Sequence, residues 1–103
     1  MRGLEELKRA VERDPENVDR WLELGKYAAD RYIVGVSEEA LSKVLEHRPR
    51  DSAVMGLLGR VLNMRRKLRD AVRVYERALE ISPDDPELLT GLGVAYSNMG
   101  ELE

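Results

Sequence analysis

The sequence predicts an all-α protein of about six helices. The first observation is a repeat, since Pro15, Pro49 and Pro83 stand 34 residues apart and the residues between them recur on the same period. The second is the helical spacing of the apolar residues, which recur at i, i+3, i+4 and i+7 within each period. A period without insertions indicates one structural unit used several times. We therefore expect antiparallel helix pairs stacked as an α-solenoid.

The first three helices are predicted from three apolar stripes. Residues 3–13 carry Leu4, Leu7, Ala10 and Val11. Residues 18–31 carry Trp21, Leu24, Gly25 and Ala28. Residues 37–47 carry Leu41, Val44 and Leu45. Ser37 is expected to cap this third helix, because its hydroxyl can accept a backbone N–H and acidic residues follow at the positive end of the helix dipole.

The last three helices repeat the pattern. Residues 52–65 carry Met55, Leu58, Gly59 and Leu62. Residues 69–81 carry Val72, Tyr75, Ala78 and Leu79. Residues 86–99 open with Pro86, which suits a first helical turn, and carry Leu89, Leu92, Gly93 and Tyr96. We expect this last stripe to pack on the preceding helix pair and to leave Leu88 and Met99 exposed.

Three glycines recur at one place in three helices, at Gly25, Gly59 and Gly93. A glycine inside a helix costs about 1 kcal/mol relative to alanine. Its recurrence predicts a close helix–helix contact at which a Cβ would clash.

These residues resemble the tetratricopeptide repeat. The resemblance rests on Trp21-x-x-Leu24-Gly25, on Met55-x-x-Leu58-Gly59-x-x-Leu62 followed by Ala71, Tyr75, Ala78 and Pro83, and on Leu89-x-x-Leu92-Gly93-x-x-Tyr96 followed by Gly100. It implies a right-handed superhelix of helix pairs. The chain departs from the family pattern at Tyr32 and Arg66, where a turn glycine is usual, and at Ala28, which replaces a large residue. The turn Arg65-Arg66-Lys67 lacks glycine and is expected to tolerate a left-handed residue poorly.

The apolar segment 32–36 is unusual for a turn. We expect its side chains to close the core at the helix ends, with a partner contact as the alternative. The predicted organisation is a single domain, 1–103, in which partial repeats 1–17 and 86–103 flank full repeats 18–51 and 52–85. Because the chain begins and ends at nearly the same point of the period, we expect a segment of a longer array.

Composition argues against several classes of function. The chain has no cysteine and one histidine, so the usual catalytic triads and zinc sites cannot be assembled. Paired acidic residues at 38–39 and 84–85 are explained by helix starts. We expect no enzyme activity, no cofactor and no bound metal. With neither a signal sequence nor a membrane span in the sequence, we expect a cytoplasmic protein.

The resemblance implies a concave groove that holds an extended peptide or a partner helix. Its residues are expected to be Asp19, Leu22, Lys26, Asp30, Arg60, Asn63, Met64, Glu87, Thr90, Val94, Ser97 and Asn98. Small and amide side chains suit peptide recognition, and Lys26 and Arg60 are suited to an acidic group. The function predicted is therefore a protein–protein interaction module with a protein or peptide partner. A solvated inner face remains the alternative for these residues.

Two other partners follow from charge and apolar area. Residues 57–79 hold seven basic and two acidic residues, whereas 80–103 hold six acidic and no basic residues. A basic stripe at Arg69, Arg73 and Arg77 could meet phosphates, but the absence of exposed aromatic residues beside it disfavours nucleic acid. The apolar last helix favours a second reading, a self-associating scaffold that forms a homo-oligomer.

Overall fold

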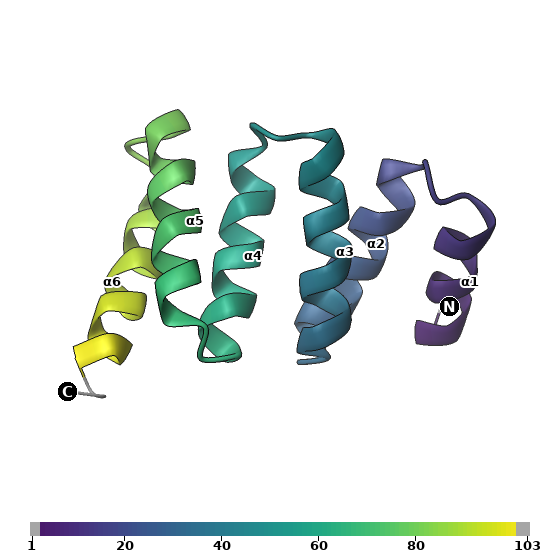
Figure 1. The fold of residues 1–103 in the computed structure, drawn as a ribbon, viewed down its shortest axis with the longest axis horizontal. Coiled ribbons are helices and arrows are strands. Elements are labelled where there is room, and N and C mark those ends of the chain that lie inside the picture. Colours follow the sequence, from purple (N-terminus) through teal and green to yellow (C-terminus); the bar gives the residue numbers. More distant parts are fainter. Residues whose placement is uncertain (1–2, 101–103) are drawn as a thin grey trace. The chain divides into compact units, whose positions relative to one another are not determined.

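The computed structural model describes residues 3–100, and over that range it contains six helices and no strand (Figure 1). The helices are α1 (Leu4–Arg13), α2 (Val18–Asp30), α3 (Val34–His47), α4 (Ser52–Met64), α5 (Leu68–Ile81) and α6 (Pro86–Gly100). The predicted all-α class is confirmed. The helix bounds agree with expectation within a residue, apart from the start of α3. The handedness of the superhelix stays a prediction.

Helix α3 begins three residues earlier than the sequence predicted. The expected cap residue, Ser37, lies inside the helix and is fully buried, and its hydroxyl donates a hydrogen bond to the carbonyl oxygen of Gly25 (2.9 Å). Val34 and Val36 form the first turn, and Val36 packs against the core. The interpretation of Ser37 as a cap was therefore wrong, because the hydroxyl has a tertiary partner instead.

The two turns without glycine are left-handed. Tyr32 has φ 59° and Arg66 has φ 61°. At each turn the next residue closes the helix end, since Ile33 N–H donates to Ala28 (2.8 Å) and Lys67 N–H donates to Leu62 (2.9 Å). This is the Schellman arrangement, which usually has glycine at the left-handed residue. A residue with a Cβ pays about 1–2 kcal/mol there. Tyr32 is 76% exposed, so it does not close the core as expected.

The chain divides into two compact units, residues 1–49 and 50–103. In the first unit, α2 packs against both α1 and α3. The core cluster consists of Leu7, Val11, Leu24 and Ala40. The predicted glycine contact is present, because a Cβ on Gly25 would lie 2.8 Å from Leu41. The Trp21 indole N–H donates to the Pro15 carbonyl (2.7 Å) and fixes the turn that enters α2.

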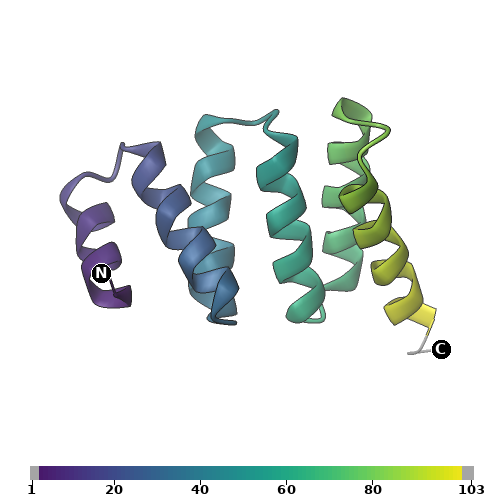
Figure 2. The ribbon, with the colours of Figure 1, turned by 180° about the vertical axis from the view of Figure 1, so that it is seen from behind.

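In the second unit, α4, α5 and α6 pack against one another (Figure 2). The ring of Tyr75 on α5 lies between two glycines. A Cβ on Gly59 of α4 would lie 2.7 Å from the ring, and a Cβ on Gly91 of α6 would also clash with it. The ring therefore takes the place of two missing side chains and joins all three helices.

Helix α6 packs through the opposite stripe from the one predicted. Leu88 is 3% exposed, whereas Leu89 is 51% exposed and Tyr96 is 52% exposed. Leu88 occupies space beside Gly56, where a Cβ would lie 2.9 Å from its side chain. In α2 and α4, the Leu-Gly stripe faces the helix that follows in the same repeat. Over residues 3–100, α6 has no such following helix, so its equivalent stripe lies open.

Candidate partner-binding groove

A cleft of about 730 Å³ opens in the second unit between α4 and α6. Its lining residues are Arg60, Asn63, Met64, Tyr75, Pro86, Glu87, Thr90, Gly91, Val94 and Asn98. The α4 residues are spaced at i, i+3 and i+4, which places them on one face of that helix. The α6 residues recur about once per helical turn and likewise share one face. Helical geometry therefore brings two short stripes to the same opening.

Seven residues predicted for the groove line this cleft. They are Arg60, Asn63, Met64, Glu87, Thr90, Val94 and Asn98. Ser97 is on α6 but does not line it. In the first unit, Asp19, Leu22 and Lys26 lie along a separate depression of about 500 Å³ on α2. Asp30 is exposed at the end of α2 and lines neither opening.

Three residues at the cleft were missed by sequence reasoning as site residues, Tyr75, Pro86 and Gly91. Tyr75 was placed in the core, and it is indeed only 4% exposed. Gly91 is what lets the ring reach the cleft, because any side chain there would occupy the ring's position. The sequence signal for this contact is Gly91 itself, because it is a helical glycine that does not belong to the repeated Leu-Gly pair.

The Tyr75 phenol stays protonated at neutral pH. Burial raises its pKa above the ordinary value, and the positive charge of Arg60 opposes that rise. A neutral phenol both donates and accepts hydrogen bonds. The cleft floor is therefore an apolar ring with a polar tip.

Asn63 ties the wall of the cleft together. Its Nδ2 donates a long hydrogen bond to the Gly91 carbonyl (3.4 Å), and the residue is 9% exposed. Among residues 3–100, its Oδ1 is buried and finds no hydrogen-bond donor. An acceptor left unpaired in this way costs about 1–3 kcal/mol. This unpaired acceptor belongs to a residue that lines the cleft.

The cleft opening has both charged and apolar side chains at its edge. Arg60 and Glu87 are exposed and of opposite sign, and Val94 is 45% exposed between polar neighbours. The Asp85 carboxylate accepts the Glu87 N–H (2.9 Å) and so begins α6 at the cleft edge. The opening thus offers an apolar contact with charged groups at its rim.

In the first unit, charged residues make structural contacts. Asp19 pairs with Arg48 (2.9 Å) and links the start of α2 to the end of α3. His47 lies 3.5 Å from Glu16, and its Nδ1 lies 3.0 Å from the Lys43 carbonyl oxygen. The Lys43 carbonyl, and after it the Glu16 carboxylate, raise the pKa of His47 above its usual value. The ion pair with Arg48 gives the Asp19 carboxylate a structural role that needs no bound ligand.

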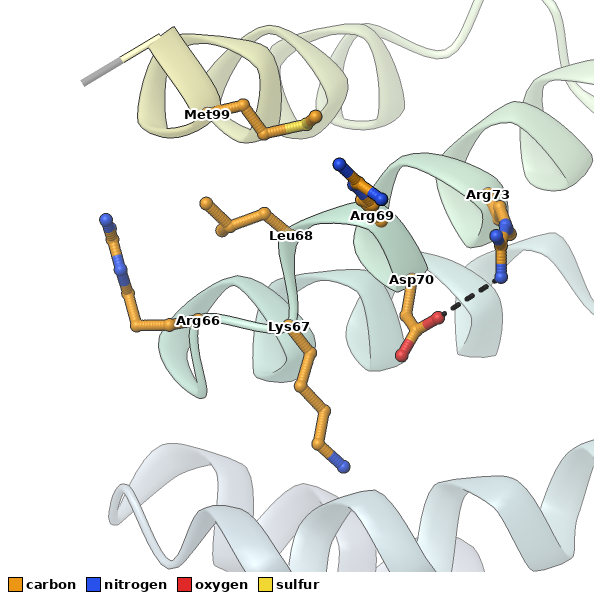
Figure 3. A pocket seen from close by; sticks show the side chains of 7 residues that line it. All are labelled: Arg66, Lys67, Leu68, Arg69, Asp70, Arg73 and Met99. Carbon is orange, nitrogen blue, oxygen red and sulfur yellow. Dashed lines mark ion pairs between the residues drawn. The ribbon is translucent and has the colours of Figure 1, made fainter. Parts of the chain in front are cut away.

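The basic segment forms a second pocket, shown in Figure 3. Arg66, Lys67, Leu68, Arg69, Asp70 and Arg73 line it from the α4–α5 turn and α5, and Met99 lines it from α6. Arg73 pairs with Asp70 (3.5 Å). Its lining contains no aromatic side chain on which a base could stack. Within residues 3–100, no cluster of acidic or histidine side chains fits a metal ion, and no helix is long and apolar enough to cross a bilayer.

Comparisons with known proteins agree with the repeat. A family model described as TPR repeat matches residues 59–100. A solved structure of MamA (AMB-1) is 25% identical, with a TM-score of 0.88 over 94% of this chain and 53% of its own. Another MamA crystal structure is 26% identical, with a TM-score of 0.87 over 95% of this chain and 57% of its own.

A curated relative, the BBSome complex member BBS4 of Bos taurus, is 35% identical over 54 residues, which are 52% of this chain and 10% of that protein. The chain thus spans little more than half the length of the MamA structures and a tenth of BBS4. The repeat period, the helix packing and these matches agree that the chain is similar to tetratricopeptide-repeat proteins, with the family model matching its second unit.

Proposed function

We propose that the chain is a non-enzymatic interaction module whose second unit binds an extended peptide segment of a partner protein in the cleft between α4 and α6. The observation that carries the proposal is the convergence of both helix faces on one opening of about 730 Å³. That volume lies within the range of about 300–1,000 Å³ common for binding pockets. The similarity to a protein named as a member of a complex supports the same class of function.

The lining suits a peptide better than a rigid small molecule. Met64 and Val94 supply apolar area, and a methionine adapts its shape to different side chains. Asn63, Thr90 and Asn98 carry the amide and hydroxyl groups that pair with a peptide backbone. The buried Oδ1 of Asn63 would gain a partner from a backbone N–H.

Arg60 selects the charge of the peptide. A guanidinium pairs with a carboxylate through two parallel hydrogen bonds. The preferred segment is therefore an apolar residue followed or preceded by an acidic one. Lys26 of the first unit carries the same charge but lies along a different, smaller depression.

A peptide array tests the proposal, with decapeptides that carry one Leu or Met and either acidic or basic neighbours as probes. Binding of the best acidic peptide is measured by fluorescence anisotropy. Val94→Arg, at a 45% exposed position in the cleft, should weaken binding at least tenfold. Leu89→Arg, a comparably exposed residue of the same helix outside the cleft, is the matched control and should bind as the parent does.

Charge reversal provides a second measurement. Arg60→Glu should weaken the acidic peptide and favour the basic series, whereas Lys26→Glu should change neither. Equal loss in both reversals would show that binding follows overall charge and would contradict the cleft as the site. Unchanged binding in Val94→Arg would reject it as well.

A further inference from the structure

The outer face of α6 is apolar and uncovered over the residues described. Leu89 and Tyr96 are each about half exposed, Leu92 is partly buried, and a Cβ on Gly93 would meet no described atom within 4 Å. These four residues are called the outer stripe. At the equivalent places, Gly25 receives Leu41 and Gly59 receives Tyr75. The Leu-Gly stripe thus packs against a following helix at its first two occurrences, whereas at the third, on α6, no described residue covers it.

We propose that the outer stripe of α6 pairs with the outer stripe of a second copy of this chain, with the two helices antiparallel about a two-fold axis. The stripe reads the same in both directions, since its spacing is three, one and three residues. An axis between Leu92 and Gly93 sets Leu92 against the partner's Gly93, and Leu89 against the partner's Tyr96. A large side chain then lies over a glycine, as Leu41 lies over Gly25.

Charge decides the orientation of the pair. The outer stripe continues at helical spacing to Met99, which lines the basic pocket (Figure 3). The charged residues of that pocket are four basic ones, Arg66, Lys67, Arg69 and Arg73, and one acidic one, Asp70. The opposite end of α6 carries the acidic residues at 84, 85 and 87. An antiparallel pair brings the acidic end of one helix beside the basic pocket of the other copy, and it does so twice. A parallel pair would place like charges together.

The other helix of this chain that suits the stripe by register, α1, is a poorer occupant. Its large apolar residue at that register, Leu7, is 2% exposed because it is already buried against its own unit. The remaining face of α1 is charged and lines a polar depression with Glu6, Arg9 and Arg13. A head-to-tail chain of copies would therefore have no apolar anchor. The outer stripe contributes no residue to the peptide cleft.

The test is sedimentation equilibrium of the whole chain from micromolar to millimolar concentration. The expected result is a mass that rises with concentration toward twice the monomer and no further, with weaker association in high salt. Leu89→Lys with Tyr96→Lys should leave a monomer whose helical circular dichroism is unchanged, since both sites are half exposed. Val94→Lys, on the cleft side of the same helix, is the matched control and should still dimerise.

Cross-linking tests the orientation, and the absence of native cysteine makes it simple. A mixture of Leu89→Cys and Tyr96→Cys chains should form the mixed disulfide at least tenfold faster than either chain links to itself. Faster self-linking would indicate a parallel pair and overturn the proposal. So would a mass that stays monomeric at every concentration, growth beyond the dimer, or a dimer that survives the two lysines. Loss of dimer in Val94→Lys alone would place the contact on the cleft side instead.

Discussion

The two units make the same helix–helix contact in different ways. In the first, Gly25 receives the end of the Leu41 side chain, and the Ser37 hydroxyl adds a buried hydrogen bond to the Gly25 carbonyl. In the second, Ala71 stands at the place of Ser37 and offers no hydroxyl, while Gly59 receives the whole ring of Tyr75. That ring needs a second glycine, Gly91, on its other side.

This difference shows how one repeat acquires a site that its neighbour lacks. The Leu41 side chain packs against Gly25 and does not line the cleft between α4 and α6. The longer Tyr75 side chain extends past Gly59 and reaches the floor of that cleft. The helices that open a repeat are α2, α4 and α6. The second unit contains two of them, α4 and α6, whereas the first unit contains α2. A groove between such helices can form within the second unit alone.

The largest expected effects test whether the two units are equally stable. Leu24 and Leu58 occupy the same register and are both buried. Replacement of either by alanine should destabilise its unit by about 2–5 kcal/mol through loss of contacts and the cavity left behind. Urea unfolding followed by circular dichroism measures the total, and the fluorescence of Trp21 reports the first unit alone.

If the units unfold separately, Leu58→Ala should leave the Trp21 transition in place and shift only the remaining helical signal. Coincident shifts of both signals in Leu58→Ala would show one cooperative domain. A loss below about 1 kcal/mol at Leu58 would contradict its assignment to the core.

The glycine contacts should respond unequally to an added methyl group. Gly59→Ala and Gly91→Ala should each destabilise the second unit by about 1–3 kcal/mol, because Tyr75 is held on both sides and cannot move aside. Gly25→Ala meets Cδ2 and Cγ of the flexible Leu41 side chain and lies at ordinary contact distance from Ala40, so the gain of about 1 kcal/mol in helix propensity should offset most of its clash. Thermal unfolding of the variants measures the difference.

Gly93→Ala is the control for this series, since its Cβ would enter open space and should stabilise α6 at concentrations where the chain is monomeric. Equal losses at Gly25 and Gly59 would refute the difference drawn between the leucine and the tyrosine contacts.

The smallest expected effect concerns a feature that the units share. Tyr32→Gly and Arg66→Gly should each stabilise the chain by about 1 kcal/mol, because glycine adopts a left-handed backbone without a Cβ penalty. Both side chains are exposed, so little packing is lost. Midpoints of urea unfolding provide the measurement. Destabilisation at Tyr32 alone would mean that its ring makes a contact that matters for the first unit.

Helical periodicity was sufficient to predict the six helices and the close contacts at Gly25 and Gly59. The contact predicted at Gly93 was wrong over the described residues, because a Cβ there would meet no atom within 4 Å. Helical periodicity also identified the residues that share a face of α4 or α6, because residues three and four apart in a helix lie together regardless of their surroundings. It could not show that Asp19 is held by Arg48, or that Ser37 bonds to a neighbouring helix rather than capping its own. Both depend on partners at least a dozen residues away in the sequence.

The packing of α6 was decided by tertiary structure alone. Leu88 and Ala95 form one stripe and Leu89 with Tyr96 forms another, and both have helical spacing. The sequence determined that both stripes exist. The neighbouring helices determined which stripe is buried. Gly56 on α4 leaves space that the Leu88 side chain occupies, and the Tyr75 ring on α5 packs against the backbone of α6 at Gly91. Complementary shape between elements, which no single helix encodes, made that choice.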